Sequence, residues 1–277
     1  MSDTPGPDPY PQAPPPPPGF GAVPAEPLPE LDLTPPAHQN RLSVFFRIIL
    51  LIPHILVLIV LGIGAFFVTV IGWFAALILG RLPDWIFDFL SSFLGYQVRF
   101  NTSAMLLTDR YPPFRLSEPA SPEDFPARIT IPRPDALNRL AVLFRIILLI
   151  PCWIVSTVLT GGWWSICIIW WIVVLIMGRS PEPLWGASTA VLRYEFRYYA
   201  YTTMLTSAYP KKIFGDAADP NQAPVSASRP LVLSSGARVL LIVIIVLGAL
   251  SALTNGLQTG RQDSGGNNPY TNAAARP

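Results

Sequence analysis

Two long apolar runs dominate the pattern of hydrophobic and polar positions along this 277-residue chain. Residues 48–79 and residues 146–177 each contain 32 consecutive positions without Asp, Glu, Lys or Arg. Because about 20 apolar residues are enough to cross a bilayer, each run is a candidate membrane span. A third, shorter apolar stretch covers residues 238–253 and carries no charge after Arg238. The pattern therefore predicts an all-α integral membrane protein.

Each long run exceeds the length of one crossing and contains glycines near its middle. A continuous 32-residue helix would be about 48 Å long, whereas the hydrocarbon core is about 30 Å thick. Gly62 and Gly64 lie within the first run, and Gly161 and Gly162 lie within the second. We therefore expect each run to form a transmembrane helical hairpin that turns at these glycines. A single, steeply tilted helix is the alternative.

The segment after each run mixes apolar and polar positions at helical spacing. In residues 84–109 the apolar side chains recur every three or four positions, at Ile86, Phe89, Leu90, Phe93, Phe100 and Leu107. The other side carries small or polar residues, including Asp88, Gly95, Arg99 and Thr102. This pattern is typical of an amphipathic helix at the membrane interface. We expect Asp88 to pair with Arg99 on its surface, and Glu195 with Arg197 in the second copy.

The chain is a tandem duplication with a constant offset of 98 residues. The line NRLSVFFRIILLIPH at 40–54 returns as NRLAVLFRIILLIPC at 138–152, and 12 of the first 14 positions are identical. The match continues until Tyr111-Pro112 meets Tyr209-Pro210. The predicted order is a disordered proline-rich tail (1–39), repeat unit 1 (40–114), a linker (115–137), repeat unit 2 (138–212), a linker (213–235), a C-terminal transmembrane helix (236–255) and a disordered tail (256–277).

The predicted topology follows from the number of crossings in each unit. Two crossings would place the basic residues that border the runs on one side of the membrane, as the positive-inside rule requires. Three crossings would invert the second unit relative to the first. We therefore expect both units to share one orientation, with the N-terminus in the cytoplasm. Residues 1–39 contain 14 prolines and no Lys or Arg, which indicates a solvated arm with polyproline II character.

Composition and motifs narrow the candidate chemistry. Only 13% of residues are charged and the net charge is +2, so no nucleic-acid partner is expected. The sequence contains no phosphate-binding loop, Cys/His metal cluster or plausible Ser-His-Asp set. We therefore expect no enzyme activity, no cofactor and no metal. Cys152 and Cys167 lie in apolar runs, and no disulfide is expected.

A few polar residues at the edges of the runs remain as candidate sites. His54 is a possible polar site within the membrane, for which a hydrogen bond to a neighbouring helix is favoured over titration or metal binding. The arginines are candidate contacts to lipid headgroups or to the interface, beside a simpler role as topology signals. They are Arg47, Arg81 and Arg99 in the first unit, and Arg145, Arg179 and Arg197 in the second.

Three motifs together carry a resemblance to a known family. RLSVFFRIILLIPH opens the first run, GRLPD closes it, and LLTDRYPPF at 106–114 ends the unit. In combination they resemble the bacterial membrane family called domain of unknown function 4389, present here in two tandem copies. The second copy departs from the pattern, with Cys152 in place of His54 and SAYPKKIF in place of the DRYPPF end. The resemblance implies a membrane fold and brings no known reaction.

The expected function is therefore a class rather than a reaction. The leading hypothesis is a non-enzymatic accessory or scaffold protein of the cell envelope, located as a multi-pass protein in a bacterial inner membrane. Its expected partners are membrane lipids and a cytoplasmic protein that binds the proline-rich tail. The alternative is a small transporter or channel that uses the interface between the two repeats, and a lipid-modifying enzyme ranks last. The composition is typical of an actinobacterium.

Overall fold

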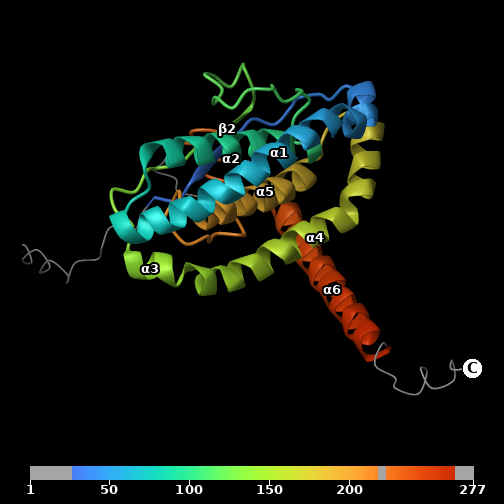
Figure 1. Ribbon diagram of the computed structural model, residues 1–277. Coiled ribbons are helices and arrows are strands. Elements are labelled where there is room, and N and C mark those ends of the chain that lie inside the picture. The colour runs from blue at the N-terminus through green and yellow to red at the C-terminus, as the bar shows by residue number, and fades with distance from the viewer. Residues whose placement is uncertain (1–26, 218–222, 266–277) are drawn as a thin grey trace, which may run out of the picture.

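The computed structural model describes residues 27–217 and 223–265. The chain order of its elements is β1 (Glu30–Leu33), α1 (Arg41–Leu79), α2 (Asp84–Ala104), β2 (Ala127–Thr130), α3 (Arg139–Leu143), α4 (Arg145–Met177), α5 (Glu182–Thr202) and α6 (Ser235–Gly265). The fold is mostly helical (Figure 1). Helices α1 and α4, together with residues 235–256 of α6, are long and apolar enough to cross a membrane.

The predicted hairpins are wrong, because each apolar run continues through its glycines as one helix. Helix α1 is 39 residues long and includes Gly62 and Gly64. A Cβ at Gly62 would lie 3.9 Å from the Phe93 ring, and one at Gly64 would lie 3.9 Å from the Phe89 ring. A Cβ at either position would therefore make an ordinary van der Waals contact with a side chain of α2. These glycines do not break the helix, since glycine is well tolerated inside apolar membrane helices.

Local signals at the helix ends explain where both long helical segments begin and end. The side chain of Asn40 accepts a hydrogen bond from the backbone N–H of Leu42, and Asn138 does the same for Leu140. Gly80 and Gly178 end α1 and α4 in the left-handed conformation, with φ of 71° and 65°. Asparagine is a preferred N-cap, and glycine adopts positive φ without strain. The two repeats thus use the same caps.

The two repeats contact each other through pairs of equivalent interactions. Trp73 Nε1 donates to the carbonyl of Val142 at 3.0 Å, and its counterpart Trp171 donates to the carbonyl of Val44 at 2.9 Å. The same exchange joins Leu137 N–H to Gly80 C=O and Gln39 N–H to Gly178 C=O. Each helix therefore ends where the other repeat begins, so α1 and α4 run antiparallel (Figure 1).

A short antiparallel pair of strands lies within segments that were predicted to be a tail and a linker. Strand β1 pairs with β2, and Leu31 stands opposite Ile129, the residue that the 98-residue offset assigns to it. The prediction of a disordered tail is therefore wrong for residues 30–33, and the prediction of an all-helical protein misses this pair. Residues 1–26 lie outside the described ranges.

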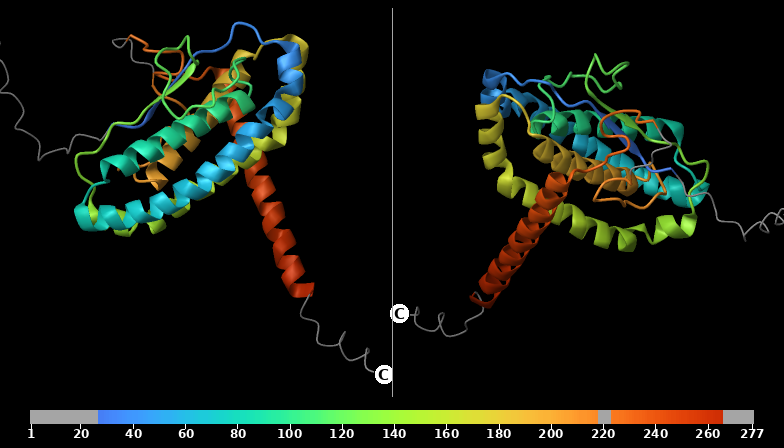
Figure 2. Two further views of the ribbon diagram at one scale, coloured as in Figure 1. Left: turned by 45° about the horizontal axis from the view of Figure 1, so that its top comes forward. Right: turned by 180° about the vertical axis from the view of Figure 1, so that it is seen from behind.

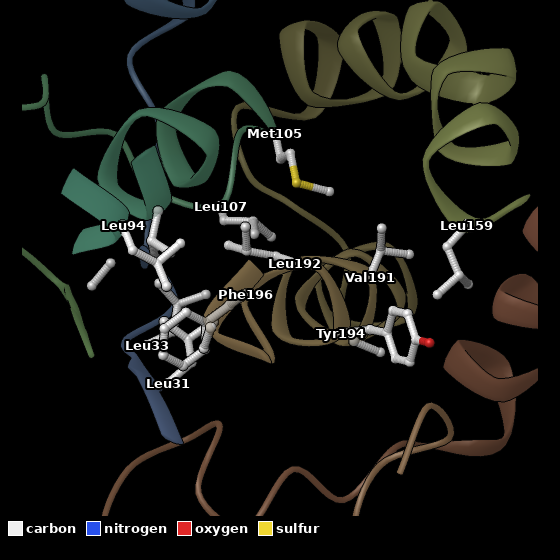
Figure 3. Close-up of a cluster of buried hydrophobic side chains, with 14 of the residues drawn as sticks. Leu31, Leu33, Leu94, Met105, Leu107, Leu159, Val191, Leu192, Tyr194 and Phe196 are labelled. Carbon is white, nitrogen blue, oxygen red and sulfur yellow. The ribbon is translucent and has the colours of Figure 1, made fainter. Parts of the chain in front are cut away.

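Helices α2 and α5 form the middle of three layers. They contact each other, the strands contact them on one side, and α1 and α4 contact them on the other. Figure 3 shows Leu31 and Leu33 of β1 gathered against Leu94 of α2 and Phe196 of α5. The predicted polar side of the first amphipathic helix is wrong in part, because Gly95, Arg99 and Thr102 are buried.

Helix α6 packs on α4 and α5 and then projects away from the other helices (Figure 2). It continues past residue 255 to Gly265, so the predicted disordered tail is wrong for residues 256–265. Gly162 of α4 and Gly248 of α6 meet where these helices cross. A Cβ at either position would lie 1.8 Å from a carbonyl oxygen of the other helix. The crossing therefore depends on two glycines, and glycines are also common where helices of known membrane proteins pack closely.

Candidate functional site

An apolar cavity of about 380 Å³ lies between the two repeats. It is bounded by the first half of α1, the end of α2 and the second half of α4, and the lining includes Ile48, Leu51, Ile55, Phe100, Trp163 and Ile168. Ile48 and Ile168 are 71% and 69% exposed, so the cavity opens onto the apolar outer surface of these helices. Its size is within the range of ligand pockets, and its wall suits a hydrocarbon chain.

Arg47 places a buried charge at this cavity. The side chain is 3% exposed, and it forms a hydrogen bond and an ion pair with Asp109 at 3.4 Å. Asp109 also accepts a hydrogen bond from the backbone N–H of Asn40. Among the described residues, Nε of Arg47 has no hydrogen-bond partner. An unsatisfied buried donor carries a desolvation cost of about 1–3 kcal/mol. One further acceptor that bonds to Nε of Arg47 would remove this cost.

The tryptophans on the α4 wall differ in how their indole N–H groups are used. Trp163 donates to Ser188 Oγ at 2.7 Å, and Trp171 donates to the carbonyl of Val44. Trp170 is 1% exposed, and its Nε1 has no partner within the described part of the chain. Two buried donors, Nε of Arg47 and Nε1 of Trp170, therefore belong to residues that line the same apolar cavity.

The corresponding place in the other repeat is built differently. Arg145, the counterpart of Arg47, donates to the carbonyl of Thr206 at 3.0 Å and lies 4.1 Å from the centre of the Tyr201 ring. The counterparts of Trp163 and Trp170 are Ala65 and Gly72. The residues that line the cavity are therefore present at one of the two inter-repeat contacts and absent from the other.

His54 is fully buried in an aromatic cluster. Its Nδ1 is hydrogen-bonded to the Tyr96 hydroxyl of α2 at 2.5 Å, and its ring stacks on Phe114 with centroids 3.8 Å apart. The second repeat has Cys152 and Lys212 at the equivalent positions. A cavity of about 480 Å³ lies beside Lys212, where the first repeat has its Phe114 ring.

Arg99 and Arg197, which were predicted to contact lipid headgroups or the interface, are only 1% exposed and donate to residues of neighbouring loops. Arg99 donates to Glu118 at 3.0 Å and to the carbonyl of Arg115 at 2.7 Å. Arg197 donates to the carbonyl of Pro29 at 3.0 Å. Burial and the neighbouring Arg193 lower the pKa of Arg197 to about 10, so it still carries its charge at neutral pH. Both arginines therefore connect loops to the middle helices through hydrogen bonds.

The remaining predicted arginine sites differ in exposure. Arg81 and Arg179 are exposed where α1 and α4 end, and their contact with lipid stays a prediction. Arg145 is as deeply buried as Arg47.

The predicted surface ion pairs are also wrong. Asp88 pairs with Arg133 at 2.8 Å, and Arg197 pairs with Glu30 at 3.5 Å. Glu195 instead accepts a hydrogen bond from Ser156 Oγ of α4 at 2.7 Å, and Thr160 bonds to it as well. The spacing of residues along α5 did not show that the Glu195 carboxyl group faces α4.

Glu195 is a partly buried acid that faces hydroxyl groups. Its pKa is raised by burial, and the hydrogen bonds from Ser156 and Thr160 offset part of that rise. The equivalent residue in the first repeat is Gln97, which cannot titrate. Within residues 27–217 and 223–265, no three His, Cys, Asp or Glu side chains are grouped closely enough to hold a metal ion.

Comparison with known proteins adds a family and no activity. No curated protein matches the chain, and no solved structure matches it. The family model described as a domain of unknown function, number 4389, matches residues 41–115 and again residues 139–213. These two matches cover more than half of the 277 residues and coincide with the two repeats. The chain therefore belongs to the family of domain of unknown function 4389, of which it carries two tandem copies.

Proposed function

We propose that this protein is a non-enzymatic accessory or scaffold protein of a bacterial inner membrane, where it presents a folded polar layer to the adjoining aqueous side. One observation carries this proposal, namely the two-sided distribution of its surface. The outer faces of α1, α4 and α6 expose large apolar side chains, among them Phe66, Phe74, Ile168 and Val239. The strands lie on the other side of α2 and α5. Apolar surface of this extent is typical of a site that contacts a membrane or another protein.

The buried charges of the molecule support a structural role. Arg193 pairs with Asp216, and Asp216 also accepts a hydrogen bond from the backbone N–H of Leu231. Arg197 holds the segment before β1, and Arg99 holds the loop that follows α2. These contacts fasten the loops around the strands to the middle helices. A loop layer that is fixed in this way is suited to docking, because little conformational entropy remains to be lost on binding.

The test is to identify what accompanies the protein in its own cells. In-cell crosslinking, mild detergent extraction and purification are followed by mass spectrometry of the bound proteins. A matched variant lacks residues 1–26 only, because Leu31 belongs to the core and Gln39 bonds to Gly178. A stoichiometric partner that is lost with residues 1–26 supports a scaffold that uses its proline-rich segment. A protein that purifies alone contradicts the proposal.

A small transporter or channel is the second candidate, and Glu195, which lies within the second repeat, is the observation that favours it. Acidic groups inside membrane proteins often belong to proton or ion paths. Glu195 faces Ser156 and Thr160 of α4, and this set has no counterpart in the first repeat, which has Gln97, Leu58 and Gly62. Proteoliposomes that contain a pH-sensitive dye measure proton flux. Transport predicts flux that Glu195→Gln removes and the exposed control Asp88→Asn preserves, whereas equal traces from protein and empty vesicles contradict it.

A further inference from the structure

The cavity between α1 and α4 combines an apolar wall with buried hydrogen-bond donors. Its wall is built from aliphatic and aromatic side chains, and its rim opens at Ile48, Trp164 and Ile168, all of which are more than 60% exposed. A volume of about 380 Å³ suits one hydrocarbon chain rather than a whole two-chain lipid. An occupant that enters from the bilayer would therefore insert one chain and leave the rest of the molecule outside.

The polar groups that line the cavity indicate which chemical group the occupant carries beside its hydrocarbon chain. Arg47 lies in the first two turns of α1, close to Asn40 and Asp109. Its Nε is unpartnered, and so is Nε1 of Trp170, within the described residues. Both side chains are more than nine-tenths buried and line the cavity. An oxygen-rich group that reached these two donors would satisfy them, and arginine binds phosphate and carboxylate oxygens strongly.

We propose that this cavity binds one anionic glycerophospholipid from the surrounding bilayer. One acyl chain lies along the α1 and α4 walls, and phosphate or ester oxygens accept hydrogen bonds from Arg47 and Trp170. Asp109 already neutralises part of the arginine charge, and the phosphate adds a second negative group, so the headgroup must lie near the water where its remaining charge is solvated. This inference rests on the proposed membrane location, and it adds a ligand class and a site.

The experiment uses the full chain reconstituted in nanodiscs that contain equal amounts of phosphatidylglycerol and phosphatidylcholine. After transfer to a mild detergent, native mass spectrometry counts the lipids that stay with each protein. We expect one phosphatidylglycerol per chain, retained in preference to phosphatidylcholine. A parallel sample with added oleate tests whether a free fatty acid takes the site.

Matched variants place the lipid in the cavity. Cys167 lines it on α4, and its counterpart Thr69 lies on α1 in the other inter-repeat contact. Cys167→Phe fills the cavity and should lower lipid retention about tenfold, whereas Thr69→Phe should leave it unchanged. Arg47→Gln should abolish the preference for phosphatidylglycerol, and Arg47→Lys should restore part of it. Circular dichroism and size-exclusion chromatography select the variants that are folded.

The outcomes of these experiments test the lipid site separately from the proposed scaffold function. Retained phosphatidylglycerol that falls with Cys167→Phe and not with Thr69→Phe supports the site. Three results would overturn the site. They are lipid retention that is the same in both variants and the wild type, equal retention of phosphatidylglycerol and phosphatidylcholine, and replacement of the phospholipid by oleate. Partner capture from cells is a separate measurement. A lipid-binding protein without a partner would contradict only the scaffold, and a scaffold without bound lipid would contradict only this site.

Discussion

Arginine shows how one residue type takes different roles in two copies of the same repeat. Arg47 pairs with Asp109, whereas its counterpart Arg145 donates to a backbone carbonyl and stacks on Tyr201. The difference follows from two exchanges, because Asp109 is Ser207 in the second repeat and Ser103 is Tyr201. Planar guanidinium groups suit both arrangements, since they donate in several directions and stack on aromatic rings. The two copies therefore share a backbone pattern while their buried charges are balanced differently.

The pair of Arg193 and Asp216 should be a major source of stability. Their side chains are 1% and 13% exposed, so loss of the carboxylate leaves a buried and uncompensated guanidinium. We expect Asp216→Asn to lower the stability by about 3 kcal/mol. The exposed pair of Asp88 and Arg133 is the control, and Asp88→Asn should cost less than about 1 kcal/mol. Thermal unfolding in detergent, followed by circular dichroism, measures both, and equal effects would contradict the difference in burial.

The same pair predicts a dependence of stability on acid. Burial raises the pKa of Asp216, but the Arg193 guanidinium and the hydrogen bonds of Leu231 and Lys212 outweigh it and hold the pKa at about 2. A carboxyl whose folded pKa lies below its unfolded value stabilises the fold fully above the unfolded pKa of about 4. This stabilisation is lost as the pH falls from about 4 to about 2. The gap in melting temperature between wild type and Asp216→Asn should therefore narrow across that window, and a constant gap would contradict the assignment.

At the scale of elements, glycine decides how closely helices approach and not where they turn. Gly162 accepts the backbone of α6, whereas a Cβ at Gly62 or Gly64 would make only an ordinary contact with a ring of α2. A pair of glycines in an apolar run looks the same in sequence whether it ends a helix or admits a neighbour. The distinction depends on a second helix, which lies outside the local pattern. This is the physical reason why the hairpin prediction failed and the single-helix alternative holds.

The crossing of α4 and α6 should be sensitive to a single methyl group. Gly162→Ala would place its Cβ 1.8 Å from the carbonyl oxygen of Ile244, a separation that requires the helices to move apart. We expect it to loosen α6 and to lower the melting temperature by several degrees. The neighbour Gly161 has nothing within 4 Å of its Cβ position, so Gly161→Ala is the matched control and should be neutral.

Limited proteolysis of the segment before α6, together with the melting temperature, reads out this crossing. Equal behaviour of Gly161→Ala and Gly162→Ala would contradict the close approach. Gly248→Ala is expected to act like Gly162→Ala, because its Cβ would meet the carbonyl oxygen of Val158 at 1.8 Å.

At the scale of the whole molecule, equivalent contacts relate the two repeats by a pseudo-two-fold axis. Three sets of contacts come in equivalent pairs when 98 is added to or subtracted from the residue numbers. They are the tryptophan hydrogen bonds, the hydrogen bonds at the helix ends, and the strand pairing centred on Leu31 and Ile129. The predicted common orientation of the units in the membrane depended on two crossings in each hairpin. With one continuous and antiparallel helix per repeat, that basis is removed.

Antiparallel helices lead to a testable topology. If α1 and α4 each cross the membrane once, their C-terminal ends face opposite sides. We therefore expect Arg81→Cys and Arg179→Cys to react with a membrane-impermeant maleimide from opposite sides, in a chain with Cys152→Ala and Cys167→Ala. Both positions are exposed, so the reagent reaches either one from its own side. Labelling of both from the same side would contradict two crossings and indicate helices that lie along the membrane plane.

The features that depend on neighbouring residues along the chain were determined by the sequence alone. They include the duplication, the apolar character of three helices, the start of α1 after Asn40 and its end at Gly80, and the family of the two units. Hydrophobic composition and capping groups act over one or two helical turns, so their effect is visible in a short stretch of sequence. The chemistry of the polar residues was not determined in this way.

Only the tertiary structure decided which side of α2 is buried, which acid Arg99 meets, and that the segment before α1 pairs with one nearly a hundred residues later. It also decided where Arg47 and Trp170 come together around an apolar cavity. Each of these outcomes depends on which surfaces two distant segments present to each other. Contacts of that kind form because burial and hydrogen bonding must be satisfied for the whole molecule at once, and no single stretch of sequence contains that information.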